Sequence, residues 1–141
     1  MKLKSLITAI AALAIGANFA TAAEEDTPLA KQMSAFNKSL RTLKRQANDA
    51  SKKADNLAIL AKMKENMANA AKLEPLKTKD QPAGDKAAYV EKFKKQIAEV
   101  DKTLDTLKAA IEKGDAAEIQ ATFDKLSDEK EKGHKDFAPD E

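Results

Sequence analysis

The chain has 141 residues, with 25 Lys and Arg against 23 Asp and Glu, one histidine, and no cysteine or tryptophan. Without cysteine there can be no disulfide, thiolate-bound zinc, iron–sulfur cluster, cysteine nucleophile or C-x-x-C-H haem attachment. A single histidine also leaves no room for a metal site built from several imidazoles. The length suits one domain.

The first 22 residues have the plan of a secretory signal peptide. Lys2 and Lys4 precede an almost purely apolar run at 6–17, and small residues follow up to Ala23. The run is shorter than the roughly 20 residues of a membrane span. We expect cleavage after Ala22 or Ala23, which leaves residues 23–141 as an exported mature domain.

Removal of the signal peptide also changes the charge balance. It takes away two lysines and no acidic residue, so the mature chain carries 23 basic and 23 acidic side chains. A neutral exported domain lacks the overall basic charge that is typical of nucleic-acid binding. We expect no nucleic-acid partner, no membrane insertion after cleavage, and a monomer.

The first half of the mature chain predicts two helices, because apolar residues recur every three or four positions. The first begins at Pro28, with Thr27 as its N-cap, and ends near Ala47. A polar connection at 48–53 follows. The second helix extends to Glu74, because a proline comes next.

The second half predicts two more helices after a loop at 75–84. Asp85 is expected to cap the third helix, and Gly114 to end it. Asp115 caps the fourth, which reaches Phe137. Four amphipathic helices with mostly short connections predict an all-α, antiparallel up-down-up-down four-helix bundle.

The inward faces of these helices are rich in alanine and poor in large side chains, which favours a slender core or a core that accommodates a bound group. The expected inward residues are Leu29, Met33, Phe36, Leu40, Leu43 and Ala47; Leu57, Leu60, Ala61, Met67, Ala68 and Ala71, with Met63 at the margin; Val90, Phe93, Ile97, Val100, Leu104, Leu107 and Ile111; and Ile119, Phe123, Leu126, Lys130, His134 and Phe137.

His134, the single histidine, falls on the apolar stripe of the fourth helix near its C-terminal end. In an antiparallel bundle the start of the first helix lies beside this end, which brings Met33 to the same level. A neutral imidazole can ligate a metal, and a thioether with an imidazole is an axial pair for haem iron. The plainer alternatives are a partly exposed histidine near a helix end and a methionine that fills the core.

Several segments carry a more specific pattern. One is the segment Leu-Ala-Lys-Gln-Met, which ends at Met33, and another is Lys-Glu-Lys-Gly-His-Lys-Asp-Phe, which contains His134. Three shorter segments, at 53–56, 62–64 and 71–75, belong to the same pattern. Together they resemble the cytochrome b562 family of periplasmic four-helix haem proteins, over roughly residues 27–138. The resemblance implies that Met33 and His134 are the two axial ligands of one haem iron.

The related cytochromes c′ carry C-x-x-C-H on the last helix, and this chain has Lys130 and Gly133 at the two cysteine positions. The implied cofactor is therefore one non-covalent haem b per chain. Lys130 stands where the family tends to have arginine and could face a haem propionate; the alternative is a solvated lysine. Gly133 stands where the family often has an aromatic residue.

With both axial positions closed, the resemblance implies a single-electron carrier with an unidentified redox partner, rather than an enzyme, and no catalytic residues. Phe36, Leu40, Phe123, Leu126 and Phe137 are candidates for the pocket wall. No nucleotide-binding, zinc-protease or serine-hydrolase motif is present, and the single Glu131-x-x-His134 spacing cannot build a di-iron site. The alternative function is a haem-free periplasmic bundle that acts as an adaptor or stress-related binding protein.

Overall fold

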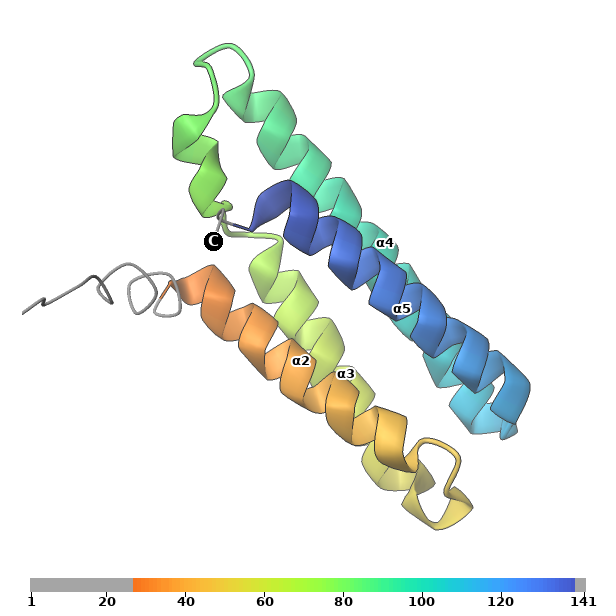
Figure 1. Ribbon diagram of the computed structural model, residues 1–141. Helices are drawn as coiled ribbons and strands as arrows, with labels where there is room; N and C mark the ends of the chain where they lie inside the picture. The colour runs from red at the N-terminus through yellow and green to blue at the C-terminus, as the bar shows by residue number, and fades with distance from the viewer. Residues whose placement is uncertain (1–26, 139–141) are drawn as a thin grey trace, which may run out of the picture.

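The computed structural model describes residues 27–138, so the signal peptide expected at 1–22 lies outside the described residues. The elements are α2 (Pro28–Gln46), η1 (Ala50–Lys52), α3 (Lys53–Ala70), η2 (Leu76–Asp80), α4 (Lys86–Lys113) and α5 (Ala116–Phe137), where η marks a 3-10 helix. Figure 1 shows two helical hairpins, α2 with α3 and α4 with α5, side by side. The predicted all-α four-helix bundle is confirmed.

Local capping chemistry sets most of the helix ends. The Thr27 hydroxyl accepts a hydrogen bond from the Ala30 amide at 3.1 Å, and the Asp115 carboxylate accepts one from the Glu118 amide at 3.0 Å. Gly114 ends α4 in the left-handed conformation, with φ of 73°, which glycine adopts without steric cost. These three predicted signals are confirmed.

Asp85 precedes the first residue of α4, as expected, but two other details differ from the prediction. The side chain of Asp85 makes no capping hydrogen bond, because its backbone is already close to helical and an N-cap needs an extended conformation. The Asp85 and Lys86 amides instead donate to the carbonyl of Pro82, at 2.9 and 3.2 Å. The second long helix ends at Ala70, four residues before the predicted end, and turns carry the chain to a buried proline at position 75.

The core runs along the axis of the bundle and contains side chains from all four long helices. Its fully buried large side chains include Leu43, Leu60, Met63, Met67, Leu104, Leu107, Ile111, Ile119 and Leu126. The predicted stripe of α3 was wrong in phase: Met63, expected at the margin, is 0 % exposed, whereas Ala61 and Ala68 are exposed.

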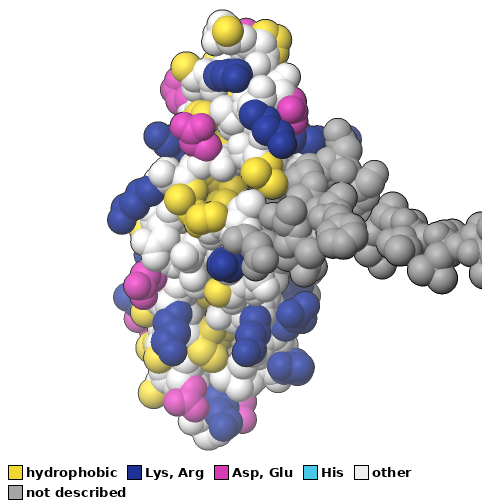
Figure 2. Space-filling model, turned by 90° about the vertical axis from the view of Figure 1, so that its left-hand side faces the viewer, with side chains coloured by type: hydrophobic (Ala, Val, Ile, Leu, Met, Phe, Trp, Pro, Cys, Tyr) yellow, Lys and Arg dark blue, Asp and Glu magenta, His cyan; other side chains and the backbone are white. Residues whose placement is uncertain are grey.

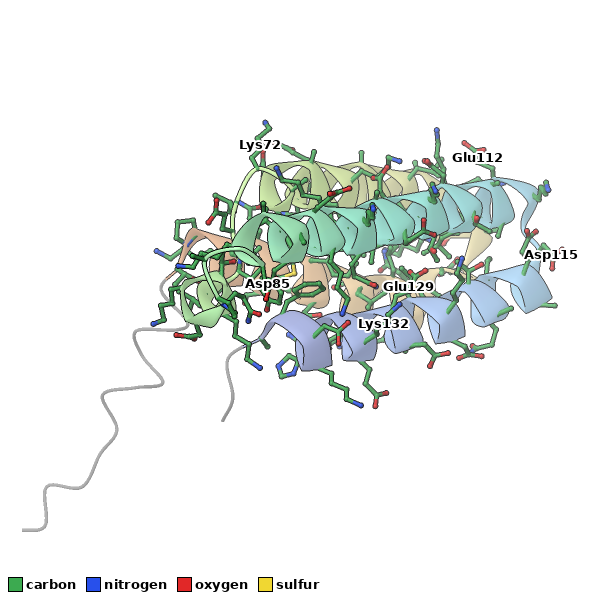
Figure 3. All side chains as sticks on the ribbon, turned by 90° about the horizontal axis from the view of Figure 1, so that it is seen from above. Lys72, Asp85, Glu112, Asp115, Glu129 and Lys132 are labelled. Atoms are coloured by element: carbon green, nitrogen blue, oxygen red, sulfur yellow. The ribbon has the colours of Figure 1, made fainter. Side chains whose placement is uncertain are left out.

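Polar contacts fix how the helices pair. Asn56 on α3 is 0 % exposed; its side-chain carbonyl accepts from the Gln46 amide at 2.8 Å, and its own amide donates to the Gln46 backbone carbonyl at 3.1 Å. Glu129 reaches from α5 toward α4 (Figure 3) and accepts a hydrogen bond from the Thr103 hydroxyl at 2.8 Å. Each contact ties two neighbouring helices at a defined register.

Lys64 links α3 to α4 through two carboxylates. Its ammonium lies 2.6 Å from Asp105 and 3.1 Å from Asp101. Partial burial lowers the pKa of Lys64, but the hydrogen bonds to Asp105 and Asp101 outweigh that effect and raise the pKa above its ordinary value. Lys64 therefore stays charged at neutral pH. No described helix combines the length and the apolar character needed to cross a membrane.

Candidate functional site

A groove of about 440 Å³ runs between α2 and α5, the two helices on the near side of the bundle in Figure 1. Its α2 wall is formed by Asn37, Leu40, Arg41 and Lys44, and its α5 wall by Ser127, Lys130, Glu131 and His134. Two of the sequence-predicted site residues, Lys130 and His134, therefore share one groove.

His134 borders this groove with an exposed side chain. The expectation that it shares the buried stripe of α5 was wrong. At about 100° per residue, His134 is displaced roughly 80° around the helix from buried Leu126, and this rotation turns it from the core toward α2. The imidazole is therefore accessible at the seam between two helices.

Met33 lies on the α2 side of the same seam. It is half-buried and packs against the core, one turn before Asn37, which lines the groove. The contact between Lys44 and Ser127 sets a common level on the two helices. Met33 lies eleven residues before Lys44, and His134 lies seven residues after Ser127. Because the two helices are antiparallel, both displacements run in the same direction, and the two residues differ in level by about four residues. At 1.5 Å per residue that is roughly 6 Å along the axis. The two predicted ligands thus lie at the same end of the seam.

Lys44 crosses the seam at the other end of the groove. Its ammonium donates to the Ser127 hydroxyl at 2.8 Å and lies 6.0 Å from the centre of the Phe123 ring. Ser127 in turn donates to the Phe123 carbonyl at 2.9 Å. This contact bridges α2 and α5 beyond the site.

The charges and donors of the groove suit an iron porphyrin. Arg41, Lys44 and Lys130 supply cations that can pair with carboxylates, and Met33 and His134 supply a thioether and an imidazole. Of the five expected wall residues, Leu40 lines the groove, while the other four are buried in the core, where they pack against neighbouring helices. The described residues contain no cluster of three His, Asp or Glu side chains suited to a metal ion.

The last turn of α5 is fastened to α4 on the side away from the groove. The Tyr89 hydroxyl donates to the Asp136 carbonyl at 2.9 Å, and the Lys92 ammonium lies 3.0 Å from the Asp136 carboxylate. The Phe137 ring packs 5.3 Å from both the Tyr89 and the Phe93 rings. These contacts fix the backbone that carries His134.

Gly133 gives a prediction about stability at this end of the bundle. A β-carbon at this position would lie 3.8 Å from the Gln96 side chain, an ordinary contact distance. Glycine weakens a helix interior, so Gly133→Ala is expected to raise the free energy of unfolding by about 1 kcal/mol. Urea denaturation of both proteins measures the change. A lower stability in the variant would contradict this account of the site.

Five groove residues were not predicted from the sequence: Asn37, Arg41, Lys44, Ser127 and Glu131. A signal for the first three was present, because positions four, eight and eleven residues after Met33 fall close to its face of the helix. Ser127 and Glu131 had the same kind of signal, because they stand seven and three residues before His134.

Among the comparisons with known proteins, a model of the cytochrome b562 family matches residues 28–138, nearly the whole described range. Neither the search of curated proteins nor the search of solved structures returns a match. Members of the matched family are electron carriers with a b-type haem and are not typically enzymes. Because the match covers well over half of the chain, the protein belongs to the cytochrome b562 family.

Proposed function

We propose that this protein is a periplasmic electron carrier that binds one haem b per chain without a covalent link, with Met33 and His134 as the axial ligands. The observation that carries the proposal is the seam between α2 and α5. It holds the only histidine of the chain, a half-buried methionine on the facing helix and three cations that border one groove. Bound in this way, the iron would exchange one electron.

The chain's own residues have separable roles in this proposal. His134 would hold the iron through an imidazole nitrogen and Met33 through its sulfur, and with both ligands in place the bound group would supply electron transfer and not oxygen chemistry. The soft sulfur favours the reduced ion and raises the potential. Lys130, one turn before His134, pairs with a propionate, and Arg41 across the groove offers a second cation. Leu40 supplies apolar contact at the α2 wall.

The proposed compartment and processing follow from the basic and apolar N-terminus and from the periplasmic location of the family. Cleavage after Ala22 or Ala23 would release a neutral domain that begins shortly before Thr27. We expect it to work as a monomer and to exchange electrons with a separate protein.

Titration of the purified apoprotein with haem tests the function. We expect a break at one haem per chain and, on reduction, the sharp visible bands of a six-coordinate low-spin iron. Haem at about one hundred times its dissociation constant should add about 2.7 kcal/mol to the free energy of unfolding. If neither the bands nor the stabilisation develops, the protein is a haem-free helical bundle.

A further inference from the structure

Helix α2 carries an unbalanced charge, only part of which borders the groove. Between Pro28 and Gln46 the sequence has five Lys and Arg and no Asp or Glu. The other residues within 27–138 carry 18 basic and 18 acidic side chains. The net positive charge of the described residues therefore equals the charge of this one helix.

Three of these cations form one surface, named here the α2 basic stripe: Lys38, Arg41 and Arg45. They are spaced by three and four residues, which places them on one face of the helix, and all three are exposed. The stripe extends over about 10 Å. Figure 2 shows Lys and Arg side chains gathered over the lower half of the face that includes α2, with acidic side chains toward its edges.

None of the three cations of the stripe has a carboxylate partner among residues 27–138, and α2 itself contains no acidic residue. On α4, by contrast, Lys95 pairs with Glu91 at 3.1 Å and Lys102 with Glu99 at 3.0 Å. Like charges without counter-charges repel one another, so the stripe weakens the isolated helix slightly. A carboxylate-rich surface would remove that repulsion.

The position of the stripe connects it to the site. Arg41 belongs both to the stripe and to the α2 wall of the groove, opposite Lys130 and His134 on α5. The apolar face of α2 is buried in the core through Phe36, Leu40 and Leu43. The exposed face is thus charged without an apolar strip that could enter a lipid bilayer, which membrane-surface helices require. A protein surface fits it better than a membrane.

We infer that the α2 basic stripe is the docking face for a carboxylate-rich protein partner. Such a face steers a partner of opposite charge into contact and falls in strength as salt rises. The inference rests on the proposed function only in taking that partner to be the electron donor or acceptor, whose redox centre would then lie beside the groove. The docking itself requires only the exposed cations.

Binding of a fluorescent oligoglutamate peptide to the full mature apoprotein tests the docking face. The test variant is Lys38→Gln/Arg45→Gln, which leaves the groove lining intact. The matched control is Lys95→Gln/Lys102→Gln, which removes the same charge from the ion-paired lysines of α4. At about 0.1 M ionic strength charges more than about 10 Å apart are largely screened, so each variant reports its own surface.

We expect the α2 variant to weaken peptide binding by about fivefold or more and the α4 variant by less than about twofold. Equal losses in the two variants would overturn the inference, since net charge alone would then explain binding. Phosphatidylglycerol vesicles are the second probe; tighter α2-dependent binding to them than to the peptide would also overturn it, in favour of a membrane surface. Because no haem is present, these results stand apart from the haem titration.

Discussion

Replacement of His134 by alanine is expected to lower the affinity for haem by at least about a hundredfold. Loss of a residue that merely orients a metal ligand costs roughly ten- to a hundredfold in affinity, so loss of the ligand itself should cost no less. The apoprotein should keep its stability within about 0.5 kcal/mol, because the side chain is exposed. Absorption titration and urea denaturation measure the two effects.

The Met33→Ala variant should behave differently from His134→Ala. It retains the imidazole, so haem still binds but the sharp six-coordinate bands are lost and the reduction potential falls with the loss of the sulfur. Met63→Leu, which removes a core methionine of α3 away from the groove, and Lys135→Ala, next to the histidine, are the controls and should keep the wild-type spectrum. A wild-type spectrum in either ligand variant would remove that residue from the proposed pair.

Substitution of buried Asn56 is expected to produce the largest loss of stability among the polar residues. Asn56→Ala removes a side chain that is 0 % exposed and leaves the side-chain amide of Gln46 without its 2.8 Å acceptor, which should lower the free energy of unfolding by about 1 to 3 kcal/mol. Asn66→Ala is the matched control. It removes a 2.8 Å hydrogen bond to Gln32 between the same two helices, but at a half-exposed position, and should cost under about 1 kcal/mol.

A charged replacement adds a pH signature. Asn56→Asp places a carboxyl where burial raises its pKa above the roughly 3.9 of an unfolded chain. The folded state then binds the proton more tightly, so the loss of stability relative to wild type is small below about pH 4 and grows as the pH rises through the raised value. A pH-independent difference between the two proteins would show that the site is open to water.

Local signals predicted the elements better than they predicted the surfaces between them. Thr27, Asp115 and Gly114 act within one helical turn, so the sequence alone identifies them. The phase of α3 was missed because its alanines are small enough for either face and carry little periodic information. Asn56 was missed for a related reason, since its burial depends on a partner ten residues away.

The candidate site shows the same division. Topology placed Met33 and His134 at one end of the bundle, and the structure agrees. The exposure of His134 was missed because two successive steps of four residues from Leu126 each exceed one helical turn, and together they rotate the side chain by about 80° from the buried face. The contact between Lys44 and Ser127 was missed because it depends on how two helices pack, and neither residue is unusual within its own helix.

The fastening of Phe137 and Asp136 to α4 has a consequence for how a ligand would be captured. A helix terminus normally frays, and a ligand held there must order the backbone of several residues, each at a cost of about 1 to 2 kcal/mol. Here the Tyr89 hydrogen bond lies two residues beyond the histidine and the aromatic packing three residues beyond it, so that turn is already ordered. Binding at His134 would restrict little more than two side-chain torsions, which makes the imidazole a pre-organised ligand even though it is exposed.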